Sequence, residues 1–92
     1  MKENFKFKET LYTKEDCIPL NNFEDVTGKI LVLNPNKLNK EYRTPENQLW
    51  IANSGFGTKN YTTGTAIYST AIVDNEQARW ERYDFLGVLK DN

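Results

Sequence analysis

Residues 4–8 alternate apolar and polar side chains, with Phe5 and Phe7 on one face and Lys6 and Lys8 on the other, which is the pattern of a half-buried β-strand. Residues 48–53 also predict a strand, with Leu49 and Ile51 on one face and Trp50 and Ala52 on the other. Residues 29–34 are apolar on both faces, as expected of a central strand that is covered on two sides. The strands predicted in this way are residues 4–8, 29–34, 48–53, 65–73, 78–83 and 85–89.

One connection between these strands carries a helix-start signal. Asn34 followed by Pro35 suits a helix N-cap with proline at the first helical position, which predicts a two-turn helix over residues 36–42. Leu38 and Tyr42 are four residues apart, so they would share the buried face of that helix.

The other connections predict loops and an antiparallel sheet. Residues 13–27 indicate an irregular connection with one short helical turn near residues 14–17, and residues 74–77 indicate a tight hairpin. Hairpin-connected strands pair antiparallel, since parallel pairing needs a longer crossover. We therefore predict an α+β fold, a small mainly antiparallel β-sheet or half-closed barrel of five to six short strands with one or two short helices.

Length and charge bound the classes of protein that the chain can represent. With 92 residues it is expected to form a single domain over residues 1–92, because two hydrophobic cores would not fit. A net charge of -1 implies no general attraction to nucleic acid or anionic lipid. No apolar run reaches the length of a membrane span or of a signal-peptide core, so the sequence predicts a cytoplasmic protein without a membrane partner.

The counts of cysteine and histidine limit the chemistry. Cys17 is the only cysteine, and the chain has no histidine. These counts exclude an intramolecular disulfide, the usual structural zinc sites, and Ser-His-Asp or Cys-His catalysis. Carboxylate pairs such as Glu81 with Asp84 have no fixed separation in the sequence and are usually part of a solvated turn. We expect a protein that is not an enzyme and that has no metal site and no cofactor.

The loop of residues 54–64 is the first candidate binding segment. It contains three glycines and offers the side chains of Phe56, Lys59 and Tyr61. Glycine-rich backbone followed by lysine can cradle a phosphate, but the spacing matches neither the P-loop nor the dinucleotide-binding fingerprint. A structural loop, or a loop that presents Phe56 and Tyr61 to a partner, is therefore the favoured interpretation.

The second candidate segment is residues 79–84 at the end of a predicted strand. Odd-numbered and even-numbered residues of a strand lie on opposite faces, so each face would mix opposite charges with an aromatic ring. This composition suits either an internal salt-bridged surface or a binding patch, because Arg, Trp and Tyr are enriched in interface hot spots. The candidate partner-binding residues of the whole chain are Phe56, Lys59, Tyr61, Arg79, Trp80, Arg82 and Asp84.

A nucleic-acid or nucleotide binder is the alternative function. Between Tyr42 and Val73 the chain contains a single acid, Glu46. The same stretch carries four aromatic residues that suit base stacking, which are Trp50, Phe56, Tyr61 and Tyr68. The cations Arg43 and Lys59 make only a small phosphate footprint. Strand aromatics are also what a small β core needs, so a nucleic-acid partner is the less favoured reading.

Three motifs in combination indicate a family context. They are Thr44-Pro45-Glu46-Asn47-Gln48-Leu49-Trp50, Ser54-Gly55-Phe56-Gly57 and Arg82-Tyr83-Asp84-Phe85-Leu86-Gly87-Val88. Over about residues 28–90 their order resembles a small domain of mobile elements of low-GC bacteria, found alone or attached to large polyvalent proteins of plasmids, conjugative transposons and phages. None of these motifs is catalytic.

This resemblance implies an anti-defence role. Genes of that kind commonly serve element transfer or protect incoming DNA, and small acidic proteins among them include anti-restriction and anti-CRISPR inhibitors that act by binding and blocking. The expected function is a protein-binding inhibitor of a host defence nuclease such as Cas9. Exposed strand edges also make a homodimer conceivable.

Overall fold

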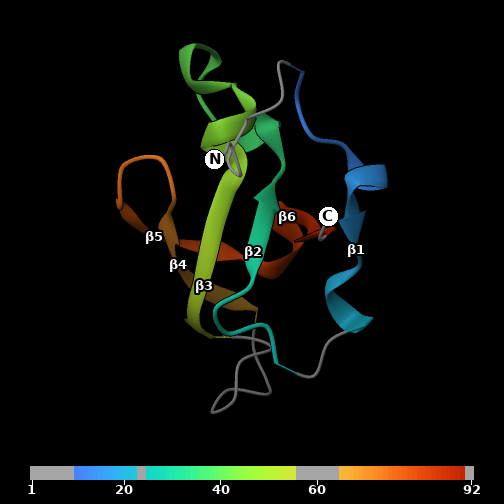
Figure 1. Cartoon of the computed structure of the whole chain (residues 1–92). Helices are drawn as coiled ribbons and strands as arrows, with labels where there is room; N and C mark the ends of the chain where they lie inside the picture. Colours follow the sequence, from blue (N-terminus) through green and yellow to red (C-terminus); the bar gives the residue numbers. More distant parts are fainter. Residues whose placement is uncertain (1–9, 23–24, 56–64, 91–92) are drawn as a thin grey trace, which may run out of the picture.

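The computed structural model describes residues 10–22, 25–55 and 65–90 and contains one antiparallel sheet of six strands (Figure 1). The predicted strand of residues 4–8 lies outside the described residues. In the sheet order β1-β6-β2-β3-β4-β5, strand β2 is interior, while β1 and β5 are the two edges. The strands are β1 (Cys17–Ile18), β2 (Ile30–Leu33), β3 (Leu49–Gly55), β4 (Ala66–Ala71), β5 (Gln77–Glu81) and β6 (Phe85–Leu89).

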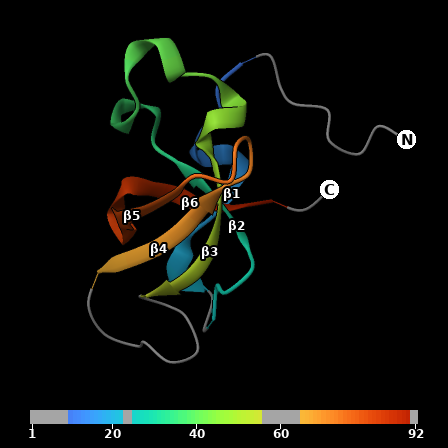
Figure 2. The ribbon, with the colours of Figure 1, turned by 90° about the vertical axis from the view of Figure 1, so that its left-hand side faces the viewer.

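The sheet is strongly curled but not closed. β5 and β6 follow each other in the chain, although three other strands lie between them in the sheet order. In a flat sheet they would be about 19 Å apart. The turn that joins them, η6 (Arg82–Asp84), cannot extend across more than about 14 Å. The sheet must therefore curl, as its two views show (Figures 1 and 2), but β5 and β6 do not pair within the described ranges.

The connections are short 3-10 turns. The described residues contain no α-helix, and none of their helical turns has the length and hydrophobicity needed to span a membrane. The fold is thus mainly β, and the predicted α+β class is not confirmed. The turns are η1 (Lys14–Asp16), η2 (Leu20–Asn22), η3 (Pro35–Lys37), η4 (Lys40–Tyr42), η5 (Pro45–Gln48) and η6.

The predicted two-turn helix over residues 36–42 is wrong, although its start signal is present. The Asn34 Oδ1 atom accepts a hydrogen bond from the Asn36 backbone N–H at 3.0 Å, as an N-cap does. Leu38 then returns to extended backbone, and a separate 3-10 turn follows. Leu38 packs against the core, but Tyr42 is exposed. One apolar contact does not offset the cost of nucleating a longer helix.

The other strand predictions are confirmed with small shifts of their ends, and the predicted turn near residues 14–17 is η1. The strand predicted at 78–83 ends at Glu81, because the next three residues form η6. β1 was not predicted; its residues Cys17 and Ile18 pair with Leu89 and Val88 of β6. A two-residue strand has no period to detect.

Both faces of β2 are buried, as predicted. On one face Leu31 and Leu33 belong to a cluster that includes Trp50, Ile67 and Phe85. On the other face Val32 packs with Leu49 and Tyr12. Burial of each large aliphatic side chain contributes about 1.5–3 kcal/mol, so these two clusters supply the main stabilisation of the curled sheet.

Gln48 joins the segment before β1 to the sheet. Its side chain is fully buried, and its Oε1 accepts a hydrogen bond from the Tyr12 backbone N–H at 2.9 Å. Its Nε2 donates to the carbonyl oxygens of Tyr12 at 3.3 Å and Leu33 at 3.0 Å. One buried amide thus connects two segments that are far apart in the chain.

Gly87 permits the close approach of β1 to β6. A Cβ at this position would lie 2.6 Å from the Ile18 carbonyl oxygen and 2.9 Å from the Cys17 Cβ. The backbone φ of Gly87 is +152°, a value that residues with a Cβ atom rarely adopt. Both the contact and the conformation therefore require glycine.

Candidate functional site

The structure does not gather the predicted site residues into one cluster. Phe56, Lys59 and Tyr61 lie outside the described residues, so their role as contacts stays a prediction. The other four lie in three places, the outer sheet face, the core face and the turn η6, and they are respectively Arg79, Trp80, and the pair Arg82 and Asp84.

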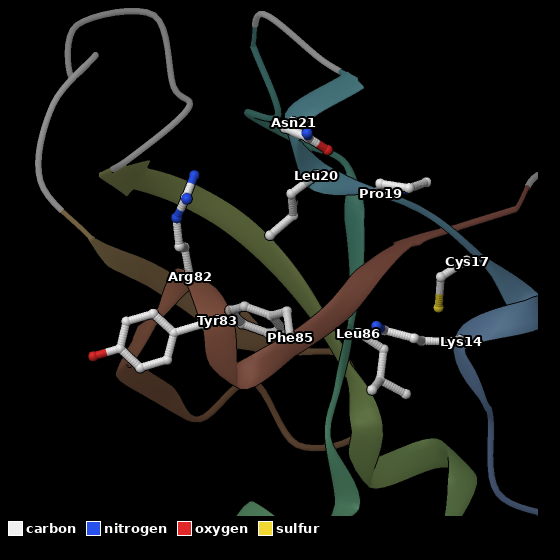
Figure 3. A pocket seen from close by; sticks show the side chains of 9 residues that line it. All are labelled: Lys14, Cys17, Pro19, Leu20, Asn21, Arg82, Tyr83, Phe85 and Leu86. Carbon is white, nitrogen blue, oxygen red and sulfur yellow. The ribbon is translucent and has the colours of Figure 1, made fainter.

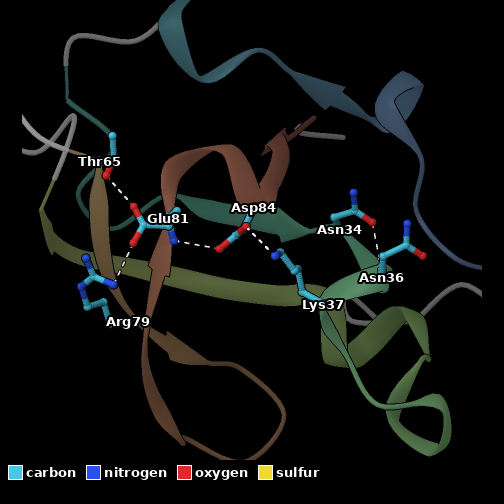
Figure 4. Close-up of polar contacts among 7 residues, drawn as sticks. All are labelled: Asn34, Asn36, Lys37, Thr65, Arg79, Glu81 and Asp84. Atoms are coloured by element: carbon cyan, nitrogen blue, oxygen red, sulfur yellow. Dashed lines mark hydrogen bonds and ion pairs between the residues drawn. The ribbon is translucent and has the colours of Figure 1, made fainter.

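On the outer face, Arg79 takes part in an internal ion pair. Its Nη1 atom lies 2.7 Å from the Glu81 Oε2 atom, and the Glu81 carboxylate also accepts a hydrogen bond from the Thr65 hydroxyl (Figure 4). Arg79 is directly opposite Tyr68, an exposed residue of β4. This part of residues 79–84 therefore has the internal salt bridge that was one of the two predicted alternatives.

On the core face, Trp80 packs against Trp50. The two rings meet edge to face, with centroids 5.5 Å apart and an interplanar angle of 79°. The Trp50 indole N–H donates to the Asn47 carbonyl oxygen at 3.1 Å. The Trp80 Nε1 atom, in contrast, is buried and has no hydrogen-bond partner among the described residues. Trp80 thus packs against the core with one part of its ring and lines a groove beside β5 with another.

We call the hollow beside β5 the hairpin groove. It has a volume of about 500 Å³, within the range of ligand-binding clefts. Trp50 and Trp80 line it, and two exposed apolar side chains, Tyr42 at 54% and Val73 at 45%, also contribute to it. The full lining is Lys37, Leu38, Asn39, Tyr42, Asn47, Trp50, Ala71, Val73, Asp74, Glu76, Ala78 and Trp80.

The charges of the hairpin groove are mainly acidic. The Lys37 ammonium lies 3.3 Å from the Asp84 carboxylate, which neutralises it. Asp74 and Glu76, next to the hairpin turn, add two further carboxylates. The groove therefore offers an apolar surface with a negative end.

One edge of the groove is an open strand edge. The Ala71 N–H donates to the Glu76 carbonyl oxygen at 2.7 Å, and the Arg82 N–H donates to that of Thr65 at 2.6 Å. Both bonds continue the pairing of β4 with β5, in which every second residue bonds across to β4. Because Glu76 and Arg82 bond across, the even-numbered residues of this segment face β4. The backbone N–H and C=O groups of Gln77, Arg79 and Glu81 therefore point away from β4. No described strand covers this edge.

Asp84 ends this open edge. Its Oδ2 atom accepts a hydrogen bond from the Glu81 backbone N–H at 2.9 Å, while its Oδ1 pairs with Lys37 (Figure 4). The Asp84 side chain is only 8% exposed, and both of its oxygens have internal partners. These contacts give Asp84 a structural role, and its predicted contact with a partner stays untested.

Replacing Asp84 with alanine should lower the free energy of unfolding by about 1.5 kcal/mol, because a largely buried acceptor of a backbone N–H is lost. Lys37→Ala is the matched control and should cost less than about 0.5 kcal/mol, since that side chain is 49% exposed. Urea unfolding measures both values. Equal losses would mean that Asp84 stabilises the fold mainly through the ion pair with Lys37 and not through the hydrogen bond from the Glu81 N–H.

Arg82 and Tyr83 line a second hollow, which shares no lining residue with the hairpin groove (Figure 3). It has a volume of about 520 Å³, and Tyr83 is 71% exposed beside it. The lining combines apolar side chains with two cations and consists of Lys14, Cys17, Pro19, Leu20, Asn21, Arg82, Tyr83, Phe85 and Leu86. The predicted alternation of residues 79–84 thus fails after Glu81, because η6 redirects the chain.

The described residues contain no group of three or more His, Cys, Asp or Glu side chains that could hold a metal ion. What the hairpin groove can do chemically is recognise, through indole and apolar surfaces, two carboxylates and unpaired backbone groups. Tyr42 and Val73 were not predicted as binding residues, although both line the hairpin groove. Their only signal in the sequence is an apolar residue beside a turn, which is common on any surface.

Comparison of the chain with protein-family models, with curated proteins and with solved structures found no match.

Proposed function

We propose that this chain is a small non-catalytic protein-binding module that holds part of another protein in the hairpin groove and blocks its activity. The observation that supports this proposal is the groove itself, with two tryptophans in its lining and exposed Tyr42 and Val73 beside them. Exposed apolar residues gathered beside aromatic ones are typical of binding surfaces. The resemblance to domains of mobile elements suggests a host defence nuclease, of the Cas or restriction type, as the blocked partner.

The groove favours a protein over a nucleic acid. Asp74 and Glu76 would repel phosphate groups, while the charge of Lys37 is neutralised by Asp84. Of the aromatic residues that suited base stacking, Trp50 is buried and only Tyr68 is exposed among those described. The charges and the exposed aromatic area therefore both favour a protein partner.

The test is capture of a partner by the tagged full-length chain from a lysate of a low-GC bacterium with intact defence systems. We expect one stoichiometric host nuclease, whose DNA cleavage stops when the purified chain is added. The double variant Tyr42→Ser with Val73→Ser should weaken capture about tenfold or more, because hot-spot side chains carry most of the binding energy. Trp80→Ala is unsuitable, since it would also remove a core contact.

Tyr83→Ser is the matched control. It removes a more exposed tyrosine that lies outside the hairpin groove, so capture should be unchanged. If Tyr83→Ser abolishes capture and the double variant does not, the hollow of Figure 3 is the site and the proposed surface is wrong. A captured protein without nuclease activity would refute the inhibitor role. Bound nucleic acid that is released at high salt would favour the alternative function.

A further inference from the structure

We propose that the open edge of β5 binds an extended segment of the partner as an added β-strand, with alternate side chains entering the hairpin groove. The inference rests on the proposed protein-binding function and specifies the form of the ligand. Two independent features lead to it. One is the row of backbone groups on the edge of β5, and the other is the apolar groove that runs beside the same strand.

The backbone groups define where the added strand pairs. Gln77 and Arg79 each direct one N–H and one C=O away from β4, and none of these four groups has a partner among the described residues. The next outward N–H, that of Glu81, is already bonded to Asp84. Pairing is therefore centred on Gln77 and Arg79 and ends at Glu81. Main-chain hydrogen bonds of this kind provide the affinity in strand addition.

The side chains of β5 define which segment fits. Ala78 and Trp80 share the core face of β5 and both line the hairpin groove, as does Glu76 just before the strand. Ala78 is small, so a partner side chain opposite it would have room above the sheet. Its surroundings, including Trp80, call for an apolar residue there and another opposite Trp80. The residue opposite Glu76 should be basic.

The predicted ligand is therefore an extended segment with two apolar residues and one basic residue at alternate positions. In the antiparallel direction, which pairs slightly better, the order is apolar-x-apolar-x-basic. In this direction charge complementarity with Glu76 fixes the order, because a segment of the reverse order would place its basic side chain opposite Trp80 and away from Glu76.

A second copy of the chain fits this edge poorly. Pairing β5 with itself about Ala78 would oppose Ala78 to Ala78 and Glu76 to Trp80, which leaves the apolar groove unfilled. Pairing about Arg79 would place two like charges directly opposite each other, which is destabilising. Pairing about Trp80 would need the Glu81 N–H that Asp84 already binds. A foreign segment is therefore the favoured occupant.

The experiment selects binders from random heptapeptides displayed on phage, with the full-length chain as bait, and then measures the synthesised peptides by fluorescence anisotropy. We expect enriched peptides with the alternating apolar and basic pattern. Arg79→Pro should weaken their binding about tenfold or more, because it removes an outward N–H and leaves the β4 ladder intact. Arg79→Ala, which keeps that N–H, should change binding less than about threefold.

A charge reversal tests the register. Glu76→Lys should weaken the binding of peptides whose basic position holds Lys or Arg. The same peptides with Glu at that position should bind the variant again. Circular dichroism and thermal melting show whether each variant is folded. If Arg79→Pro does not fold, Gln77→Pro, at the first residue of β5, replaces it as the edge variant.

Three results would overturn the inference. They are selection without enrichment, equal binding of the enriched peptides to the folded Pro variant, and self-association of the chain through Gln77 and Arg79, which would make a second copy the occupant. The proposed function fails separately. If the chain captures a protein partner through Tyr42 and Val73 and Arg79→Pro captures it equally well, only the strand addition is wrong.

Discussion

Replacing Gly87 with alanine is expected to lower the free energy of unfolding by about 3 kcal/mol, from backbone strain and overpacking together. The added methyl group would lie 2.6 Å from the Ile18 carbonyl oxygen and 2.9 Å from the Cys17 Cβ. The φ of +152° is unfavourable for alanine as well. Since β1 has only two residues, we expect it to separate from β6 before the rest of the sheet unfolds. Urea unfolding measures the loss.

Gly28→Ala is the matched control for this prediction. Gly28 also has a positive φ, +80°, but a Cβ there would meet no atom within 4 Å. Gly28→Ala should lower the free energy of unfolding by about 1 kcal/mol, which is the cost of placing alanine in this backbone conformation. Hydrogen exchange adds a local measurement, since the Lys90 N–H bonds to the Asp16 carbonyl oxygen beside β1 and should exchange faster only in Gly87→Ala. Equal costs for the two variants would show that the β1–β6 contact is not what requires glycine.

Replacing Gln48 with leucine is expected to cost about 3 kcal/mol, although leucine has a similar volume and is more hydrophobic. The change removes three hydrogen bonds inside the protein, one from the Tyr12 N–H and two to the carbonyl oxygens of Tyr12 and Leu33. Water cannot replace the lost side-chain partner easily, because the site is fully buried. Thermal or urea unfolding measures the loss of stability.

Gln77→Leu controls for the chemical change itself. Gln77 is exposed, and the same substitution there should alter stability by no more than about 0.5 kcal/mol. In Gln48→Leu the Tyr12 amide proton should also exchange with solvent much faster than in the parent protein. A cost below about 1 kcal/mol would mean that the hydrogen bonds of Gln48 contribute little net stability.

The strand predictions succeeded where the sequence has a continuous apolar run. Residues 30–33 form the interior strand β2, and Leu49 and Trp50 of β3 lie in the two different core clusters, as expected of successive residues in a strand. The helix over residues 36–42 failed because its start signal is local, whereas its continuation needed a second buried side chain. Tyr42 is exposed instead.

The candidate site was predicted only in part. Arg79 and Trp80 do lie beside the hairpin groove and its open edge, but on opposite faces of β5. Asp84 belongs to the internal contacts that end this edge. Tyr42 reaches the groove from a distant segment, and no local pattern indicates that it lies near Val73.

The sequence by itself determined the local properties of this protein: which stretches are extended, which faces of them are apolar, where the chain turns and that histidine chemistry is absent. These follow from the period of side chains along a strand and from the chemistry of single residues. Only the tertiary structure decided that the sheet curls, that Gln48 joins Tyr12 to Leu33, and that no other described strand pairs with the outer edge of β5 beside two tryptophans. The physical reason is that these features depend on contacts between residues far apart in the chain, which pattern and propensity do not specify.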